Sequence, residues 1–369
     1  MAWVLVLAVL LVALANGAND NAKGVAALIG SKMAEARPAL RFANLAALIG
    51  SLAALVAVQF DQRLVRAFGG GGLLPAGASV TRGYLLAIAL GAAATVLAAT
   101  RLGIPVSTTH AVLGALLGAG LVKVGVGQLV WSALVAKFVV PLLLSPVLSC
   151  AATLVVYPAV RRLLAAVGVE KQLCLCVESV DQPVVLRDGR LALASGRALT
   201  LDEVSRCETR LAGRILTLPA RPLIAGLFYL TSGAVCLARA LNDTPKIVGL
   251  LVTGAVLAVA PSMTAVAFAM VIGGILFSRR VAHTMSDRIA ELDLEEGLAA
   301  SVVTAALVIA ASIAALPVSA THVTVGALAG AGLARGTARL HTISAIALAW
   351  VTTLPLAAVL AAAAYLLLR

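Results

Sequence analysis

Long apolar stretches alternate with short polar ones along most of the chain, and they stand on either side of a polar central segment. They cover about 2–30, 42–60, 83–101, 103–122 and 128–157, then 222–260, 262–277, 299–315, 317–334 and 341–368. Most approach the roughly 20 apolar residues that a helix needs to cross a bilayer. The pattern predicts an all-α polytopic membrane protein with 10–12 transmembrane helices, the larger number applying if 222–260 forms two spans.

Composition supports the same class of protein. The chain is 62% apolar and only 12% charged, whereas a soluble domain carries about a quarter charged residues. A water-soluble enzyme, a disordered protein and a disulfide-rich secreted domain are excluded. The net charge of +12 is expected from basic cytoplasmic loops, so the lipid bilayer is the expected partner, and nucleic acid is not. Because no basic residue precedes the first apolar run, we expect a retained membrane helix there and no signal peptide.

The central segment, 161–221, differs from its surroundings. It alternates like a strand over 172–178, and 183–193 predicts a hairpin around Asp188 and Gly189. Residues 201–215 predict an amphipathic helix. We therefore expect a small α+β insertion, which divides the chain into membrane repeat 1 (1–160), the insertion (161–221) and membrane repeat 2 (222–369).

The distribution of basic residues also predicts an orientation. The insertion should be cytoplasmic and the N-terminus outside, in a plasma (inner) membrane. Cysteines 174, 176 and 207 are interpreted as small core residues, although a metal site was the alternative.

The two apolar halves share motifs in the same order. Residues 103–121 and 315–333 are identical at 12 of 19 positions, and both contain the pattern Pro-Val-Ser-x-Thr-His. Earlier in each half, Asn-Asp is followed three residues later by Lys, at residues 19–23 and 242–246. A unit of five spans that is repeated once must have its second copy upside down in the membrane, as in many secondary transporters. The sequence thus predicts two inverted-topology repeats.

Two carboxylates interrupt the apolar segments. Asp20 and Asp243 each follow an asparagine and precede a lysine, Lys23 or Lys246. A buried carboxylate costs about 2.5–3.5 kcal/mol in a bilayer, which favours a functional role, and Asn and Asp compete with helix hydrogen bonds. We expect broken or re-entrant helices here, with carbonyl and carboxylate oxygens that suit a cation or a proton. The alternative is an Asp–Lys pair that only neutralises buried charge.

The repeated Pro-Val-Ser-x-Thr-His motif predicts an anion site. Pro105 and Pro317 are expected in the first turn of a helix, whose free N–H groups attract anions. Neutral hydroxyl donors then bind an oxyanion without trapping it; they belong to Ser107, Thr108, Thr109, Ser319 and Thr321. The alternative is simple capping of two helices. For His110 and His322 a structural role is favoured over proton relay.

These residues carry a resemblance. The chain resembles the inorganic phosphate transporter (PiT) family in Gly17-Ala-Asn-Asp20, in Leu241-Asn-Asp243 and in both Pro-Val-Ser-x-Thr-His motifs. The resemblance covers both membrane halves but not 161–221. It implies secondary active cotransport of inorganic phosphate with Na⁺ or H⁺ by alternating access, often in a homodimer, with no cofactor beyond the coupling ion.

By the same match, Asn19 and Asn242 join the substrate-binding hydroxyls, and Asp20 and Asp243 lie at the cation and phosphate site, with Na⁺ as the possible metal. The family usually carries a second asparagine three residues after the Asp, where this chain has Lys23 and Lys246. We hypothesise that these ammonium groups neutralise the carboxylates, or contact phosphate, where a sodium ion would otherwise lie. That would reduce sodium dependence and favour proton coupling.

Three alternative functions remain open at this stage. A carrier of another tetrahedral oxyanion, sulfate or arsenate, is the nearest, although an acceptor carboxylate favours phosphate because hydrogen phosphate can donate a hydrogen bond. A non-transporting membrane sensor with the insertion as its output is the second. A membrane-embedded enzyme is the third, and we do not expect it because no nucleophile–base pair, metal cluster or nucleotide motif is evident.

Overall fold

The computed structural model describes residues 1–70, 72–75, 77–166, 173–185, 191–203, 220–289 and 292–368. These residues form two compact units, Met1–Tyr157 with Tyr229–Arg369, and Pro158–Phe228. The first unit contains the apolar segments of both halves, except the first residues of the 222–260 segment. The predicted insertion, 161–221, falls within the second.

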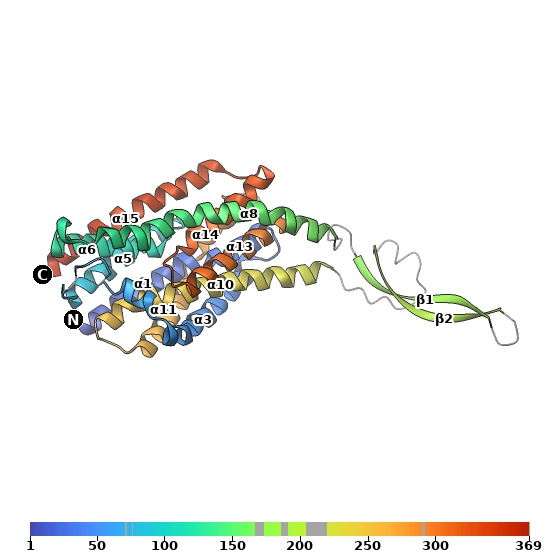
Figure 1. The fold of residues 1–369 in the computed structure, drawn as a ribbon, viewed down its shortest axis with the longest axis horizontal. Helices are drawn as coiled ribbons and strands as arrows, with labels where there is room; N and C mark the ends of the chain where they lie inside the picture. The colour runs from blue at the N-terminus through green and yellow to red at the C-terminus, as the bar shows by residue number, and fades with distance from the viewer. Residues whose placement is uncertain are drawn as a thin grey trace. The chain divides into compact units, whose positions relative to one another are not determined.

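The first half of the chain folds into a series of helices (Figure 1). They are α1 (Ala2–Asp20), η1 (Asn21–Val25), α2 (Ala26–Gly30), α3 (Ala36–Phe60), α4 (Arg63–Phe68), α5 (Arg82–Arg101), α6 (Thr108–Val124), η2 (Val126–Gln128), α7 (Trp131–Leu134), η3 (Val135–Val139) and α8 (Val140–Ala166). The helices of the second half are α10 (Ala220–Thr253), α11 (Val259–Phe277), α12 (Arg279–Asp287), α13 (Leu294–Ile313), α14 (Ala320–Arg335) and α15 (Leu340–Leu368).

Within the described residues, seven helical segments are long and apolar enough to cross a membrane. They are Ala2–Gly30, Ala36–Gln59, Arg82–Arg101, Trp131–Ala166, Val259–Phe277, Leu294–Ile313 and Leu340–Leu368. Large apolar side chains point outward from them, as Val155 on α8 and Leu367 on α15 do. Such a surface is stable against lipid and unfavourable against water, so the chain is a multi-pass membrane protein.

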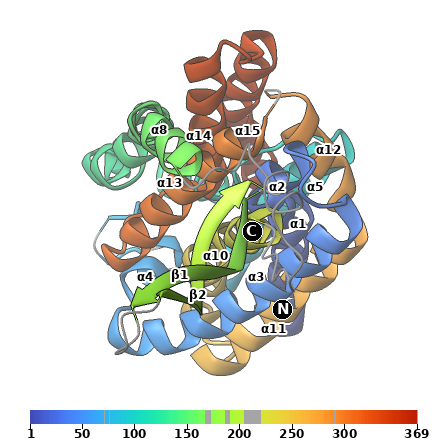
Figure 2. The same ribbon diagram turned by 90° about the vertical axis from the view of Figure 1, so that its right-hand side faces the viewer.

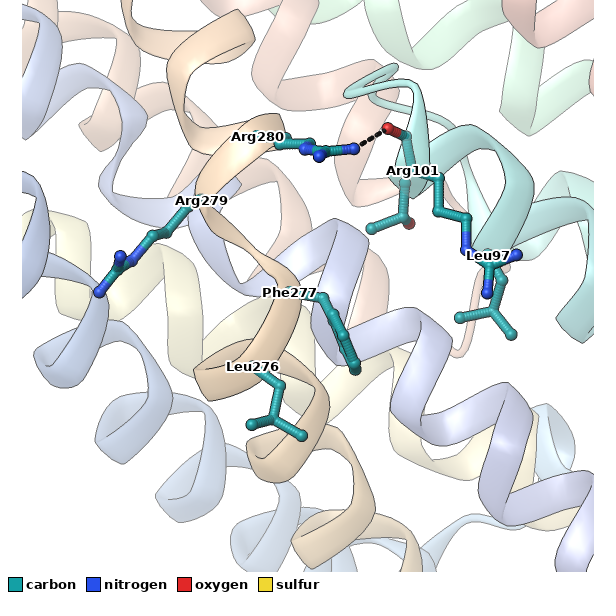
Figure 3. A pocket seen from close by; sticks show the side chains of 7 residues that line it. Leu97, Arg101, Leu276, Phe277, Arg279 and Arg280 are labelled. Carbon is teal, nitrogen blue, oxygen red and sulfur yellow. Dashed lines mark hydrogen bonds between the residues drawn. The ribbon is translucent and has the colours of Figure 1, made fainter.

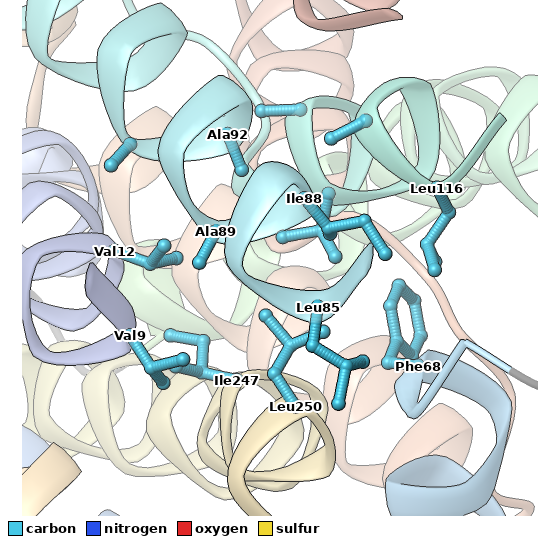
Figure 4. Close-up of a cluster of buried hydrophobic side chains, with 14 of the residues drawn as sticks. Val9, Val12, Phe68, Leu85, Ile88, Ala89, Ala92, Leu116, Ile247 and Leu250 are labelled. Atoms are coloured by element: carbon cyan, nitrogen blue, oxygen red, sulfur yellow. The ribbon is translucent and has the colours of Figure 1, made fainter. Parts of the chain in front are cut away.

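The core of this unit forms where α1, α5 and α10 meet (Figure 4). Val9 of α1, Ile88 of α5 and Leu250 of α10 are all fully buried in it. On the outer side of α1, α11 packs along α3, and the two helices lie side by side in both views (Figures 1 and 2). The centre of the bundle is therefore built from segments of both halves of the chain.

Glycines bring helices of opposite halves into close contact. A Cβ atom on Gly118 of α6 would collide with the carbonyl group of Ala358 on α15. In the matching place, a Cβ atom on Gly330 of α14 would collide with the backbone of Cys150 on α8. The equivalent helix of each half thus packs on the last helix of the other half, as the small-residue pattern favours.

The two Asn-Asp motifs differ in local structure. α1 ends at Asp20 and the chain continues through the 3₁₀ turn η1 into α2, so the helix changes its geometry there without a full break. The break predicted at Asp243 is wrong, because α10 runs without interruption from Ala220 to Thr253 with Pro245 inside it. Proline is tolerated in membrane helices when neighbouring groups satisfy the freed backbone. The 222–260 segment accordingly contains one helix, followed by a turn before α11.

The second unit contains two antiparallel strands, β1 (Leu173–Val185) and β2 (Leu191–Glu203). Val185 pairs with Leu191 and Leu173 with Glu203, so the pairing extends well beyond the hairpin that the sequence predicted. Residues 201–203 belong to β2, which contradicts the start of the predicted helix at 201. The rest of that helix, 204–215, and the side chains of cysteines 174, 176 and 207 lie outside the described residues.

Candidate functional site

Asn19 fixes the C-terminal end of α1 through its side chain. Its side-chain amide donates to Thr100 Oγ1 at 2.9 Å and to the Ile104 carbonyl at 3.0 Å, and its Oδ1 accepts from the Val106 N–H at 3.1 Å. These bonds attach the end of α1 to the extended segment before α6. Asn19 was predicted as a substrate ligand. Its three hydrogen bonds in the described part of the chain go to other groups of the protein.

Lys23 is buried in the turn that follows. Its Nζ donates to Asp20 Oδ1, to the Val106 carbonyl at 2.6 Å and to Thr321 Oγ1 at 2.7 Å. Asp20 and Val106 belong to the same half of the chain as Lys23, whereas Thr321 belongs to the other. The ammonium group thus connects the two halves.

Lys246 repeats this arrangement in the second half. Its Nζ donates to Asp243 Oδ1 at 3.1 Å, to the Val318 carbonyl at 2.8 Å and to Thr109 Oγ1 at 3.0 Å. Each of these partners stands at the repeat-equivalent position of a Lys23 partner. The match extends from the sequence motifs to individual hydrogen bonds, even though α10 is not broken.

The beginnings of α6 and α14 lie together at this point. Ser107 and Ser319 are their N-cap residues, and each accepts from the N–H three residues later, which is the usual capping interaction. Thr321 Oγ1 also donates to the Val106 carbonyl at 3.1 Å, and so connects the two helix ends directly. The N-terminal ends of α6 and α14 therefore meet beside the two lysines.

The placement predicted for the prolines is wrong. Pro105 and Pro317 precede the N-cap residues and lie outside the first turn of each helix. The serines begin the helices because their hydroxyls satisfy a free N–H, which leaves the prolines in extended backbone. Among the described residues, the hydroxyls that contact the charged groups belong to the threonines of the first turns, whereas the serine hydroxyls accept from backbone N–H groups.

Thr108 and Asn16 complete the surroundings of Asp20. Thr108 Oγ1 donates to Asp20 Oδ2 at 3.0 Å, and the Asn16 side-chain amide donates to the same oxygen at 2.7 Å. Asn16 also lies 3.4 Å from Asp243 Oδ2. The Asn16 amide therefore contacts both carboxylates. No motif in the sequence had pointed to this role.

Arg239 is the other residue that the sequence analysis missed. Its NH1 lies 3.5 Å from Asp243 Oδ2 and donates to Asn16 Oδ1 at 3.3 Å, and its NH2 donates to Asn21 Oδ1. The signal was present, because Arg239 and Asn16 each stand four residues before the motif aspartate, on the same helix face. They are equivalent positions that differ in charge.

The cluster is buried and carries an unbalanced charge. Lys23, Lys246 and Arg239 are at most 3% exposed, and Asp20 and Asp243 at most 5%. Three cationic side chains thus face two carboxylates, a formal surplus of one positive charge. Buried charges are stable only when they are paired and hydrogen-bonded, so the surplus charge favours an anion at this place.

Two polar atoms of the cluster are left open. Within the part of the chain that the structure describes, Arg239 Nε and Asn242 Oδ1 are buried without a hydrogen-bond partner. The Asn242 amide donates to Ser312 at 3.1 Å. A donor and an acceptor therefore remain available beside the charged residues.

The two histidines pack against each other behind the helix ends. The rings of His110 and His322 meet edge to face, with centroids 4.5 Å apart, and His322 stacks on Trp350. His110 Nδ1 lies 3.3 Å from the Trp350 carbonyl and His322 Nδ1 lies 2.9 Å from the Leu142 carbonyl. These contacts fit the structural role that the sequence favoured.

A surface pocket lies between α5 and the junction of α11 and α12 (Figure 3). It is lined by Leu97, Thr100, Arg101, Leu276, Phe277, Arg279 and Arg280. Thr100 is the residue to which Asn19 donates, and Arg280 donates to the Arg101 carbonyl at 2.7 Å. Three arginines thus line a pocket that shares Thr100 with the hydrogen bonds of Asn19.

The geometry defines a multi-pass membrane protein with a charged polar site inside an apolar helix bundle. Residues 16–361 match the profile of the phosphate transporter family. Because that match spans most of the chain, the chain belongs to the phosphate transporter family, as the sequence motifs indicated.

Individual relatives agree. The chain is 28% identical to "Inorganic phosphate transporter 2-1, chloroplastic" of Arabidopsis thaliana, with 94% of this chain and 68% of that protein covered. It is 26% identical to "Probable low-affinity inorganic phosphate transporter" of Rhizobium meliloti, with 95% and 91% covered. A solved structure, "The sodium-dependent phosphate transporter", has the same fold, with a TM-score of 0.73 at 20% identity over 100% of this chain and 98% of that one.

Proposed function

We propose that this chain is a secondary active transporter that moves inorganic phosphate across the membrane by alternating access, coupled to a gradient of Na⁺ or H⁺. The observation that carries the proposal is the surplus positive charge of the buried cluster at the meeting helix ends. An oxyanion neutralises this charge, and the open N–H groups of helix N-termini favour its binding. Membership of the phosphate transporter family selects phosphate among oxyanions.

The substrate is proposed to bind between the first turns of α6 and α14. Thr108, Thr109 and Thr321 supply hydroxyls there, with Ser107, Ser319, Asn19 and Asn242 shaping the surrounding backbone. Asp20, Asp243, Lys23 and Lys246 form the coupling network. Arg239, through its unpartnered Nε, is added to the predicted set as an anion ligand.

We propose that the two repeats have opposite orientations in the membrane and that this arrangement permits alternating access. The crossed bonds Lys23–Thr321 and Lys246–Thr109 join the halves at equivalent positions. If one half rocks against the other, these bonds lie at the pivot, and the substrate faces one side of the membrane at a time. The arginine-lined pocket is proposed as one access route, since guanidinium groups raise the local concentration of anions.

The proposal also includes the oligomeric state, the membrane and the orientation of the chain. We propose a homodimer in the plasma (inner) membrane, with the N-terminus outside and the 161–221 insertion in the cytoplasm. In a variant without the five native cysteines, single cysteines at residue 2 and in the insertion, labelled with a membrane-impermeant maleimide on intact cells, test the orientation. Labelling only at residue 2 is expected, and labelling of the insertion would reverse the assignment.

Uptake into proteoliposomes tests the function. Purified protein is reconstituted and labelled phosphate uptake is measured under imposed Na⁺ and H⁺ gradients, with sulfate and arsenate as competitors. Saturable uptake that a gradient accelerates, and that sulfate does not inhibit, is expected. Absence of uptake under every gradient, or preferential uptake of sulfate, would refute the proposal.

A further inference from the structure

We infer that the ammonium groups of Lys23 and Lys246 occupy the two oxygen-lined positions that a cation co-substrate would otherwise take, so that this chain carries phosphate without binding sodium. The inference rests on the proposed function and specifies its ion requirement. It is drawn from the surroundings of the two ammonium groups.

Each ammonium group lies among three hard oxygen acceptors. Around Lys23 Nζ these are a carboxylate oxygen, a backbone carbonyl and a threonine hydroxyl, from Asp20, Val106 and Thr321. The same three kinds of oxygen surround Lys246 Nζ. Carboxylate, carbonyl and hydroxyl oxygens are the ligands of hard metal cations. An ammonium has three donors, and here each donor has one acceptor.

The remaining carboxylate oxygens also face donors. Asp20 Oδ2 accepts from Asn16 and from Thr108, at 2.7 and 3.0 Å. Asp243 Oδ2 lies 3.5 Å from Arg239 NH1 and 3.4 Å from Asn16 Nδ2. A sodium ion at either aspartate would therefore have to displace a buried lysine, which would lose its partner inside the protein. As these side chains stand, they do not fit sodium.

Charge favours the same conclusion. The cluster already carries a formal surplus of one positive charge, and a sodium ion would raise it to two. In a buried site, where charges interact strongly, added cations repel one another. A phosphate monoanion alone brings the cluster to neutrality. The tethered ammonium groups thus supply the positive charge that a free cation would bring.

Counterflow in proteoliposomes tests the inference without an ion gradient. Vesicles loaded with unlabelled phosphate are placed in labelled phosphate, in matched buffers of sodium and of N-methylglucamine. We expect rates that agree within about twofold in the two buffers. A tenfold or greater stimulation by sodium would overturn the inference while leaving phosphate transport established.

Direct sodium binding supplies a second measurement, which does not depend on transport. We expect the Tm of the purified wild-type protein to stay constant with sodium at constant ionic strength, because a ligand that binds the folded state raises Tm with its concentration. A saturable rise for the wild-type protein would overturn the inference, whether or not the vesicles show uptake.

Lysine variants sharpen the comparison. Lys23→Asn and Lys246→Asn replace each ammonium with a neutral amide, and should lower sodium-free counterflow about tenfold and create a sodium-dependent rise in Tm. Lys32→Asn is the matched control, since Lys32 is exposed at a positive φ of 58° that Asn accepts, and its sodium response should equal that of the wild type. Folded variants that neither lose counterflow nor bind sodium would contradict the inference. If the variants fail to fold, the two wild-type measurements decide it.

Counterflow also separates this inference from the function itself. Wild-type vesicles that show no counterflow in either buffer would refute phosphate transport. In that case the sodium dependence of the Tm still decides whether the ammonium groups exclude sodium.

Discussion

The ammonium group of Lys23 donates a hydrogen bond to the hydroxyl of Thr321, 298 positions further along the chain, at 2.7 Å. Lys246 makes the equivalent bond to Thr109 at 3.0 Å in the opposite direction between the halves. Neither half completes its own charged site. Any movement of one half against the other must therefore change the surroundings of both lysines together.

Removing either threonine hydroxyl should lower phosphate uptake to a similar extent. In Thr321→Val or Thr109→Val, one N–H of a buried ammonium loses its acceptor, which costs about 1–3 kcal/mol. We expect phosphate uptake to fall about tenfold or more in each variant, measured in proteoliposomes. Thr352→Val is the control, because this exposed hydroxyl donates to the Leu348 and Ala349 carbonyls of its own helix. A large loss in one variant with no loss in the other would argue against equivalent sites.

Neutralising either aspartate should abolish coupled uptake. Asp20→Asn or Asp243→Asn leaves a buried lysine without its counter-ion, a change that costs about 3–5 kcal/mol, and uptake should fall about 100-fold or more. Size-exclusion chromatography in detergent should still show folded protein.

The double variant Asp20→Asn with Lys23→Met provides the control for stability. It removes both charges of the pair, so its Tm should recover relative to the single variant while its uptake stays low. Wild-type uptake by both single variants would refute the coupling role.

Arg239 should determine affinity for the anion. Arg239→Gln removes the surplus positive charge, and a charged hydrogen bond contributes about 1.5–3 kcal/mol, so the Kd for phosphate should rise about tenfold or more. Arg239→Lys keeps the charge without the planar guanidinium and should give an intermediate value. Calorimetric titration with phosphate measures both, and an unchanged Kd in Arg239→Gln would remove this residue from the site.

The close contact between α6 and α15 leaves no room for a side chain at Gly118. A Cβ atom there meets the backbone of Ala358, so Gly118→Ala should destabilise the protein by about 1–3 kcal/mol, seen as a lower Tm. Gly127 has open space around its Cβ position, and Gly127→Ala should change stability by less than about 0.5 kcal/mol. Equal Tm values for the two variants would show that this contact is not tight.

The arginine-lined pocket should affect the rate at which phosphate arrives. Arg279→Gln with Arg280→Gln removes two positive charges from its wall, so uptake at low phosphate concentration should fall about threefold or more at low ionic strength. The difference should shrink in high salt, because salt screens such charges. Arg37→Gln, at another exposed arginine, serves as the control. An effect that does not depend on salt would contradict electrostatic attraction.

The sequence by itself determined the class of protein and most of the residues of the charged cluster. The length and composition of the apolar segments define lipid as the solvent, because no other environment stabilises so apolar a surface. The repeated Asn-Asp and Pro-Val-Ser-x-Thr-His motifs selected the residues of the cluster, since polar side chains in an apolar chain are costly without a role. Thr108, Thr109 and Thr321 were chosen in this way, and the structure brings them together with Asp20 and Asp243.

Only the tertiary structure decided the partners and the local backbone. Helix propensity predicted a break at both asparagines, yet the chain changes only from α- to 3₁₀-helix after Asn19, which makes three bonds to a neighbouring segment. At Asn242, whose amide donates to Ser312, the α-helix continues. The lysines were expected beside their own aspartates, but their bonds to threonines of the opposite half depend on packing across more than a hundred residues. Such contacts leave no local pattern in the chain. The position of Arg239 four residues before Asp243 is a local pattern, but only the tertiary structure shows that its guanidinium lies in the buried cluster.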